Sequence, residues 1–562
     1  MNRFNSMLRT GAHRWRGRPT QAAAFAVLAA ISLIQQAHAD GPTRYHVMQP
    51  ETGGVKPRAY ITSVTRTQDV TLNWIGKNGP YQVQQSPTLG PGATWQSVGD
   101  STTNTTTTVP GGTGNAFFRV GGPPLHYAGS DTCLDCHAQH VLDWQETVHA
   151  GAFDTLKSIH MDKNASCVPC HTVGFGQPSG FKDEATTPLL VGVQCENCHG
   201  PAAEHAADPG NAAKRPILDR GANVCGGCHT DAHHPNFDEF QTAPHATVLP
   251  DLQSSFTSGG AARELACGSC HSGEIRLTLL ENKGLDPVLQ RPLPAAGDAN
   301  LVGVTCAVCH DPHSVTANGY QLRNPTHSMI PFSYNTATNT SFAAQYNPNI
   351  NICGQCHNLR GGSWQSSGRP PHHSPQYNML IGDGGVVDAG VVAPQSPHRD
   401  NPNQCADCHM YRQTPAVVDD QHPMIEGHTF EPTMAACLQC HDAATADLHM
   451  QSAGIVIDHN TTKLVDALNN WALTKADSAL STKYGTLAWE YTTPGEIGNP
   501  TGAASIVGPS SSEQAKIPDN IKKARYNLYM VLHDNSKGVH NLDYANFLLT
   551  SSLEKVNIEL SH

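Results

Sequence analysis

The sequence repeats one pattern nine times: two cysteines separated by two residues, with a histidine directly after the second cysteine. Two thiols at this spacing can form thioethers with the two vinyl groups of one porphyrin, while the adjacent histidine binds the iron. Zinc knuckles and disulfides also use such cysteine pairs, but neither requires a histidine after every pair. All 18 cysteines belong to these motifs, so we expect nine covalently attached c-type haems. In chain order the motifs, which we number 1 to 9, are Cys133/Cys136/His137, Cys167/Cys170/His171, Cys195/Cys198/His199, Cys225/Cys228/His229, Cys267/Cys270/His271, Cys306/Cys309/His310, Cys353/Cys356/His357, Cys405/Cys408/His409 and Cys437/Cys440/His441.

Histidines outside the motifs are the candidates for the sixth iron ligand. The chain has 32 histidines, of which nine belong to the motifs. This surplus predicts bis-histidine coordination for most or all irons, which gives low-spin iron at low potential. Sequence context favours eight distal ligands: His149, His205, His245, His313, His373, His398, His428 and His540. The ninth stays open among His140, His160, His233, His234 and His327.

The nine motifs are crowded into residues 133–441. Since so little chain cannot build nine separate apolar pockets, we expect the porphyrins to stack against one another with polypeptide wrapped outside. The 50 glycines and 39 prolines also predict few long regular elements, because both residues disfavour helix interiors. Closely stacked haems are the arrangement that electron transfer between them requires.

The first 39 residues have the pattern of an export signal. Five arginines precede an apolar run at residues 22–34, and Ala37-His38-Ala39 follows as a cleavage site. Such a short run cannot cross a hydrocarbon core of about 30 Å, so we expect cleavage and no membrane insertion. The formal net charge of −12 argues against nucleic acid as a partner. We therefore expect a soluble protein in the periplasm or outside the cell.

Residues 58–121 contain no cysteine and have the pattern of β-strands. Val70, Leu72 and Trp74 alternate with polar residues, and Asn78-Gly79 is a hairpin turn signal. The segment predicts a small β-sandwich. Through its Tyr81–Pro87 and Phe117–Val120 runs it resembles the fibronectin-type-III-like modules of exported bacterial proteins. We favour a spacer role over binding of a partner or a glycan.

The chain after the ninth motif turns helical. Apolar residues at helical spacing run from Leu464 to Trp471 and from Ile521 to Val531, the second helix ending near Gly538, and a last helix is expected over Asp543–Val556. We therefore expect a multidomain protein. A small N-terminal β-sandwich is followed by a nine-haem cytochrome domain of loops and short helices at 125–445, and C-terminal α-helices at 446–562 pack on the haem stack.

Three segments resemble a known multihaem superfamily. They are Trp144–Ala150, the stretch from Cys195 to His205, and Ser536–Asn541. The superfamily contains the tetrahaem cytochrome of ammonia oxidisers, hydroxylamine oxidoreductase and pentahaem nitrite reductase. The resemblance implies that His149, His205 and His540 are distal ligands. The chain departs from the nitrite reductase pattern, in which a lysine replaces one motif histidine, and no catalytic residue carries over.

The sequence leaves three functions open. We favour an electron carrier that works with redox partner proteins or a terminal electron acceptor in periplasmic or extracellular respiration. An alternative is an oxidoreductase for a small nitrogen or sulfur species at one five-coordinate haem, with Tyr526, Tyr529 and Tyr544 near its pocket. The third is a surface or filament component. Because histidines exceed the expected irons in every case, the sequence does not reveal an open iron.

Overall fold

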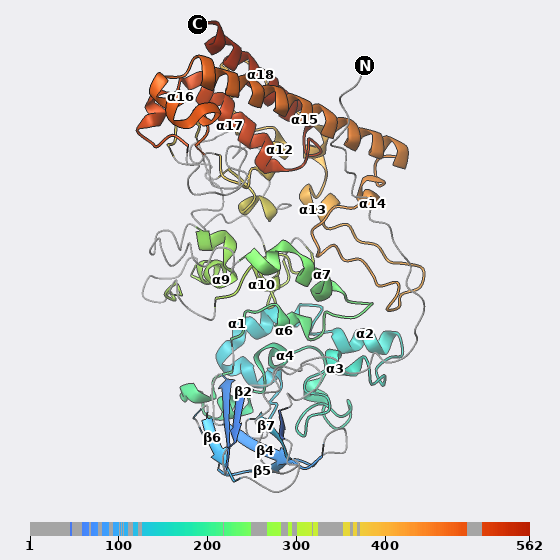
Figure 1. Cartoon of the computed structure of the whole chain (residues 1–562). Coiled ribbons are helices and arrows are strands. Elements are labelled where there is room, and N and C mark those ends of the chain that lie inside the picture. Colours follow the sequence, from blue (N-terminus) through green and yellow to red (C-terminus); the bar gives the residue numbers. More distant parts are fainter. Residues whose placement is uncertain are drawn as a thin grey trace, which may run out of the picture.

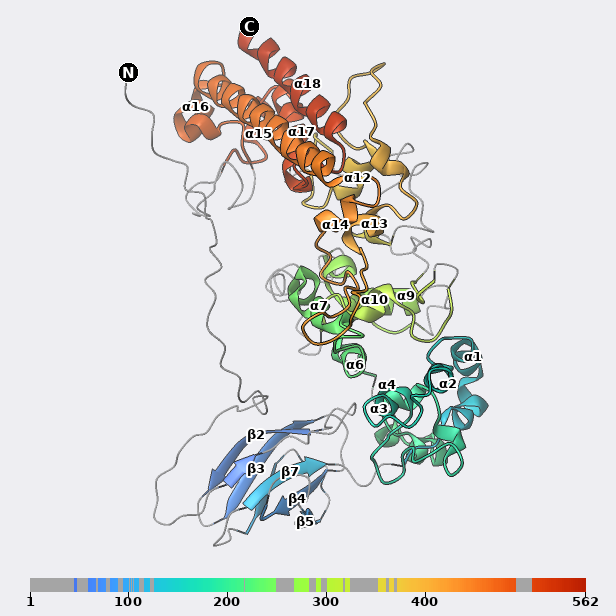
Figure 2. The same cartoon turned by 90° about the vertical axis from the view of Figure 1, so that its right-hand side faces the viewer.

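The computed structural model of the chain describes residues 45–47 and most of residues 59–562. In the described part, the β-strands lie at one end and the longest helices at the other, with the motif-bearing segments between them (Figures 1 and 2). The export signal expected at 1–39, the Asn78-Gly79 turn and His327 lie outside the described residues. So do the longer stretches 249–266, 283–289, 295–300, 324–351 and 492–507, together with shorter pieces of several loops.

Two β-sheets make up the N-terminal part of the described chain. One has the strand order β1-β7-β4-β5 and the other β2-β3-β6. Val70, Leu72 and Trp74 of β3 are buried, as their alternation predicts, and they share a core with Phe118 and Val120 of β7. The predicted N-terminal β region is therefore confirmed, although β1 precedes the predicted span and pairs in parallel with β7. The strands are β1 (Tyr45–Val47), β2 (Ala59–Arg66), β3 (Val70–Gly76), β4 (Gln82–Ser86), β5 (Gln96–Ser97), β6 (Thr106–Val109) and β7 (Ala116–Gly121).

In the described parts of residues 130–441 the helices are short, and many begin at or beside a motif. A helical turn places two cysteines that are three residues apart on the same side of the chain. The apolar clusters here are small, such as the one around Phe153, Val173 and Leu190. The helices are α1 (Leu134–Gln145), α2 (Ala152–Ser158), α3 (Val168–His171), α4 (Cys195–His199), α5 (Ala203–Ala207), α6 (Asn223–Gly226), α7 (Asn236–Thr242), α9 (Gly273–Glu281), α10 (Cys306–Cys309), α12 (Gln376–Ile381), α13 (Cys405–His409) and α14 (Met434–Cys437).

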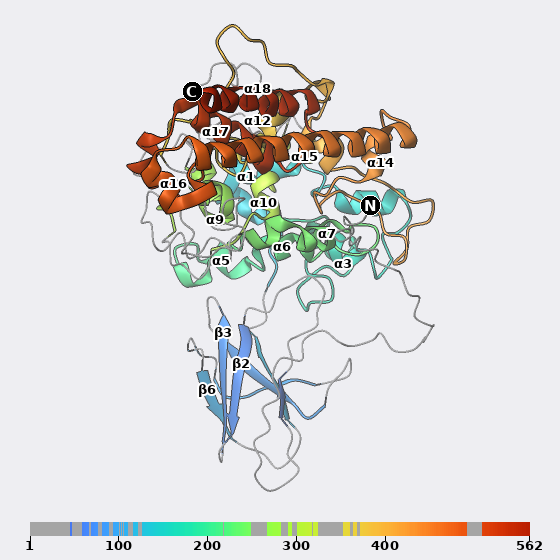
Figure 3. The same cartoon turned by 45° about the horizontal axis from the view of Figure 1, so that its top comes forward.

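The C-terminal helices hold the largest apolar core of the described chain. Leu464, Leu468 and Trp471 of α15 pack with residues of α17 and α18, including Leu528 and Leu549. The predicted C-terminal helices are thus confirmed, and Figure 3 shows α15, α17 and α18 side by side. Their bounds are α15 (Ala443–Thr474), α16 (Ser478–Tyr484), α17 (Asp519–Asp534) and α18 (Leu542–Ser561).

Two helix ends differ from the prediction. Helix α17 ends at Asp534 and not near Gly538, because Asn535 adopts the left-handed conformation with φ of 56°. Asparagine tolerates this conformation better than other residues with a Cβ, so it can end a helix as glycine does. Helix α18 runs to Ser561, beyond the predicted end, and the side chain of Asn541 caps its start by accepting from the Tyr544 N–H at 3.0 Å.

Candidate haem-binding sites

Several motif histidines place Nδ1 against a backbone carbonyl. His171 does so with Ala152 O, and His409 with Phe430 O, both at 2.8 Å. When Nδ1 carries the proton and donates it to a carbonyl, Nε2 is left with the lone pair that binds a metal. These rings are therefore arranged as iron ligands would be.

Histidines from distant segments face the motif histidines at one recurring separation. Two imidazoles bound to opposite faces of one iron through metal–nitrogen bonds of about 2 Å place their ring centroids about 6 Å apart. Six of the eight predicted distal histidines lie 6.0–6.3 Å from a motif histidine, so the residues fit bis-histidine haem. The pairs, which involve motifs 4, 3, 7, 6, 9 and 8 in that order, are His149 with His229, His199 with His313, His245 with His357, His310 with His428, His398 with His441 and His409 with His540.

The other two predicted ligands have different surroundings. The Nδ1 of His205, on α5, is buried without a hydrogen-bond partner in the described part of the chain. The ring of His373 lies 4.2 Å from that of His533, which is closer than a shared iron would allow. His533, near the end of α17, was not among the sequence candidates, since no motif or turn signal stands beside it.

Further histidines lie near motif histidines or their partners. His234 lies 6.3 Å from His229. His449, a residue of α15 that the sequence analysis missed, lies 5.9 Å from His441. Its only signal was a position shortly after motif 9. Another of the histidines left open for the ninth site, His140, lies 5.2 Å from the ring of His313.

Five predicted site residues differ from the expected enclosed stack because they lie at the surface: four belong to motifs 1, 3 and 9, and the fifth is the predicted distal ligand His373. The residues Cys136, Cys198 and Cys440 are exposed, unlike the other motif cysteines. His137 is exposed too, and its ring has neither a ring contact nor a hydrogen bond in the described part of the chain. Its backbone also breaks helix α1, with φ of −118° and ψ of 38°, so the chain leaves the helical path directly after the cysteine pair. The geometry thus gives motif 1 no axial pair, and all five exposed residues stay predicted haem-binding residues.

Cys270 and His271, in motif 5, also differ from the expected arrangement. Cys270 is buried, and its Sγ lies 3.7 Å from the hydroxyl of Ser269. A thioether forms at the edge of a porphyrin, so side chains around this buried thiol would have to move before attachment. His271 is half-buried beside it and belongs to none of the six pairs above. Motif 5 therefore stays a predicted haem site without an assigned distal ligand.

Burial keeps three of the paired histidines neutral. Desolvation lowers the pKa of His229, His245 and His428 to about 4, and the next cause in each case is the charge of the ring that faces it. A neutral imidazole is the form that binds iron, so these rings need no proton removed near neutral pH. His540 differs: burial opposes its protonation, but the charge and hydrogen bond of Asp534 outweigh burial and raise its pKa.

Thiols of different motifs lie in hydrogen-bond contact, and none of the 18 cysteines is in a disulfide bond. Because these cysteines come from distant parts of the chain, the contacts bring motifs together that the sequence separates. The hydrogen-bonded thiol pairs are Cys133 with Cys195, Cys170 with Cys228, Cys225 with Cys306, and Cys353 with Cys405. They join motif 1 to 3, 2 to 4, 4 to 6 and 7 to 8.

Electrostatic contacts extend this order. Burial of the thiol raises the pKa of one cysteine in each of motifs 3, 6 and 8. The next cause in each case is the negative charge of a cysteine in motif 4, 7 or 9, respectively. Motif 5 lies beside motif 7, since Arg276 donates to Ser269 O at 3.1 Å and contacts Cys356 Sγ at 3.9 Å. The motifs thus adjoin in the order 1, 3, 4, 6, 7, 8, 9. The cysteine pairs concerned are Cys198 with Cys225, Cys309 with Cys353, and Cys408 with Cys437.

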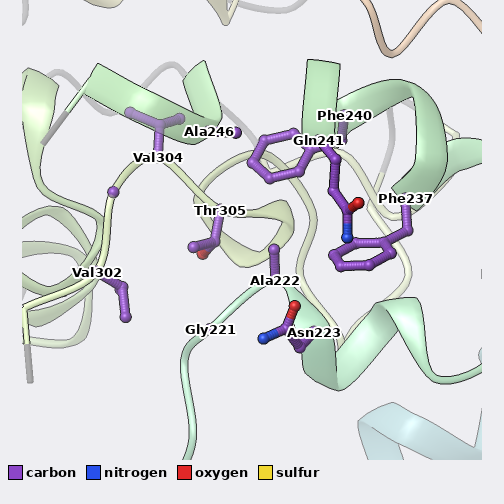
Figure 4. A pocket seen from close by; sticks show the side chains of 11 residues that line it. Gly221, Ala222, Asn223, Phe237, Phe240, Gln241, Ala246, Val302, Val304 and Thr305 are labelled. Atoms are coloured by element: carbon purple, nitrogen blue, oxygen red, sulfur yellow. The ribbon is translucent and has the colours of Figure 1, made fainter. Parts of the chain in front are cut away.

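A cavity of about 260 Å³ lies between motifs 4 and 6. Phe237 and Phe240 of α7 face it from one side, and Val302, Val304 and Thr305 line it from the segment before motif 6 (Figure 4). None of its lining residues is ionisable, and Thr305 carries the one hydroxyl among them. Apart from Asn223, Gln241 and Thr305 the lining is apolar, so the cavity suits a mainly apolar group.

The tyrosines considered for an enzyme pocket are part of the C-terminal helical core. The hydroxyl of Tyr544 accepts from the Gly385 N–H at 2.8 Å, and that of Tyr529 donates to Glu490. Tyr526 is also buried, and its hydroxyl donates to Gly384 O at 3.3 Å. These contacts account for the tyrosines as packing and hydrogen-bonding residues. In the described part of the chain, no helix has the length and apolar character of a membrane span.

Comparison with known proteins finds cytochromes at both ends of the motif region. The family described as cytochrome c554 and c-prime matches residues 132–200, and the outer membrane cytochrome MtrC/MtrF-like family, domains II/IV, matches residues 332–471. Cytochrome c-554 of Nitrosomonas europaea is 26% identical over 163 residues, which are 23% of this chain and 68% of the relative. Multiheme cytochrome MtrA of Shewanella baltica is 25% identical over 205 residues, 33% of this chain and 46% of the relative, so the chain matches less than half of that protein.

Among solved structures, outer cell wall cytochrome OcwA is similar in fold. Its TM-score is 0.50 at 18% identity, and the match covers 76% of this chain and 99% of that one. The undecaheme cytochrome from the S-layer of Carboxydothermus ferrireducens aligns with a TM-score of 0.44 at 19% identity, over 78% of this chain and 70% of that one.

Proposed function

The chain is a multihaem c-type cytochrome, and on that premise we propose that it conducts electrons through nine haems held by motifs 1 to 9. The haems supply the one-electron chemistry, while the chain fixes their spacing and axial ligands. One observation carries the proposal: thiols of different motifs touch, as Cys225 and Cys306 do. Since the thiols are the attachment points, motifs whose thiols touch would hold neighbouring porphyrins.

The proposed route follows the order in which the motifs adjoin. It runs through motifs 1, 3, 4, 6, 7, 8 and 9, with motif 2 beside motif 4 and motif 5 beside motif 7. The proposed route would run along the length of the molecule, from the segments near the β region to the start of α15. An electron carrier needs such a continuous row, whereas an enzyme needs one site that a substrate can enter.

We propose axial ligands from the separations between histidine rings. The motif histidines are the proximal ligands, and His149, His245, His313, His398, His428 and His540 are distal ligands of motifs 4, 7, 3, 9, 6 and 8. His205 and His373 are assigned to the remaining motifs 1, 2 and 5 without a specific partner.

We further propose that the protein is exported and works in the periplasm or at the cell surface, with redox proteins or a terminal acceptor as partners. The signal pattern of residues 1–39 supports export, and the similarity to an outer membrane cytochrome family supports a place in electron transfer to the cell exterior. The β region, residues 58–121, is proposed as a fibronectin-III-like sandwich that serves as a spacer. The haem domain would then span 125–445 and the helical cover 446–562.

A comparison of electron transfer with turnover tests the proposal against the enzyme alternative. The reduced, haem-loaded mature protein should be rapidly oxidised by ferric citrate, while nitrite, hydroxylamine and tetrathionate are not converted. Turnover of any of the three at about 1 s⁻¹ or faster, toward the low end of typical enzymes, would contradict the proposal. So would slow oxidation by the iron acceptor.

A further inference from the structure

His540 differs from the other proposed distal ligands in the partner of its Nδ1. That nitrogen lies 2.6 Å from Oδ1 of Asp534, the last residue of α17. The Asp534 side chain is 2% exposed, so its charge is shielded from water. The hydroxyl of Ser536 also donates to Asp534, and the same hydroxyl accepts from the His540 N–H at 3.3 Å. The carboxylate is thus held in place against the ring.

At Nδ1, other proposed ligands have a neutral acceptor, a distant acceptor or, in the described part of the chain, no hydrogen-bond partner. His398 places Nδ1 2.9 Å from Val539 O, and His409, the ring that faces His540, uses Phe430 O. His313 also has a carboxylate nearby, but its Nδ1 is 3.9 Å from Asp311, beyond hydrogen-bond reach. Asp311 is also more exposed, at 25%, and pairs with Arg323 at 3.0 Å, which offsets its charge.

A carboxylate at this position changes the iron ligand. Hydrogen bonds to an ionised acceptor are shorter and stronger than neutral ones, and a ligating histidine that donates to a carboxylate becomes more basic. A more basic ligand and a buried negative charge both stabilise ferric over ferrous iron, since the ferric form carries one more positive charge.

We infer that Asp534 is a positioning residue that fixes the Nδ1-protonated form of His540 and lowers the reduction potential of the haem at motif 8 below those of its neighbours. The inference rests on the proposed function. Motif 8 adjoins motif 7 through Cys353 and Cys405, and motif 9 through Cys408 and Cys437. Electrons that pass between motifs 7 and 9 therefore cross one uphill step, and Asp534 sets its height.

Redox titration of the haem-loaded protein tests the inference, with Asp534→Asn as the variant and Asp311→Asn as the matched control. The asparagine keeps the shape of the side chain and removes its charge. We expect Asp534→Asn to raise the potential of one centre by at least a tenfold change in its reduction equilibrium, which is 59 mV for one electron. The other centres and the haem count should not change, and Asp311→Asn should give a much smaller shift. Asp534→Glu, which keeps the charge, should restore most of the low potential.

An unchanged titration in Asp534→Asn, or equal shifts in both asparagine variants, would overturn the inference. Should Asp534→Asn fail to load haem, Ser536→Ala takes its place. It leaves Asp534 and His540 intact but removes one donor to the carboxylate, so His540 receives more negative charge and one potential should fall. An unchanged or raised potential in Ser536→Ala would contradict the inference. The titration is an equilibrium measurement, so it separates the inference from the proposed function. Electron transfer that persists without a change in reduction potential would contradict the inference alone. A changed reduction potential in a protein that turns over nitrite would contradict the proposed function alone.

Discussion

The rings of His199 and His313 are nearly parallel, with an angle of 5° between their planes and 6.1 Å between their centroids. His199 ends motif 3, whereas His313 follows motif 6, whose own histidine, His310, faces His428 instead. The short segment 310–313 therefore presents two rings to two different sites. Such sharing of one segment between neighbouring sites is how a small amount of chain can position many haems.

Replacing one distal ligand should change one potential and nothing else. In His428→Met the thioether would replace an imidazole opposite His310, and a methionine ligand raises haem potential. We expect the redox titration to show one centre moved upward, with an unchanged haem count in the pyridine haemochrome assay.

His422→Met is the control for that change. His422 lies in the same segment, but its ring is exposed and its Nδ1 contacts Asp419 at 2.9 Å. Its titration should match that of the unaltered protein. If His428→Met also leaves every potential in place, His428 is not an iron ligand.

The sequence predicted the motifs and most paired histidines because both are local signals. A histidine such as His149 stands in a recognisable segment, whereas His449 lies in the regular pattern of α15 and gives no such sign. The pairing itself could not be predicted, since the partner of His409 is His540, in the loop before the last helix. Contacts over such separations depend on how the whole chain packs, and the motif spacing carries no information about that.

The same limit applies to helix ends and strands. The period of apolar residues located α17, but the left-handed Asn535 ended it earlier than the expected glycine. The strand β1 was missed because three residues, Tyr45–Val47, are too few to display an alternating pattern.

Motif 3 should depend on the buried carboxylate of Glu196. This side chain is 2% exposed and accepts the N–H groups of Ala128, Gly129 and Ala202 at 2.7–3.0 Å. Glu196→Ala leaves two buried donors and one partly buried donor without their acceptor, which should cost on the order of 3 kcal/mol. We expect a lower Tm in a thermal scan of the haem-loaded protein.

Glu204→Ala is the matched control, because Glu204 is exposed on α5 in the same region. Its Tm should change little. Equal losses in both variants would mean that the hydrogen bonds of Glu196 do not hold this part of the chain together.

Removal of the β region should leave haem loading intact. The strands β1–β7 pair only with one another in the described part of the chain, and their core cluster contains no residue beyond Val120. A protein that begins at Leu125 behind a new signal peptide should therefore contain nine haems and keep the spectrum of the full chain. Loss of haem in this truncation would mean that the β region supports the motif-bearing part, and loss of transfer to an outer acceptor alone would identify it as a docking module.

The haem count is open to direct measurement. Pyridine haemochrome absorbance against protein mass should give nine c-type haems per chain, and Cys195→Ser should reduce loading by one. A ratio of seven or fewer in the unaltered protein would show that some motifs do not bind haem.

The most direct test of the conducting route uses protein anchored to an electrode through a tag after His562. Integrated charge in fast voltammetry, compared with the haem count, gives the fraction of haems in electronic contact with the C-terminal end. The test variant lacks motif 4 (Cys225→Ala with Cys228→Ala), which adjoins motifs 2, 3 and 6, and the control lacks motif 2 (Cys167→Ala with Cys170→Ala), a side branch. We predict that all haems contribute to the integrated charge in the unaltered protein and in the motif 2 variant. Without motif 4, the haems of motifs 1, 2 and 3 should no longer contribute. Full charge in the motif 4 variant, or equal loss in both, would contradict the route.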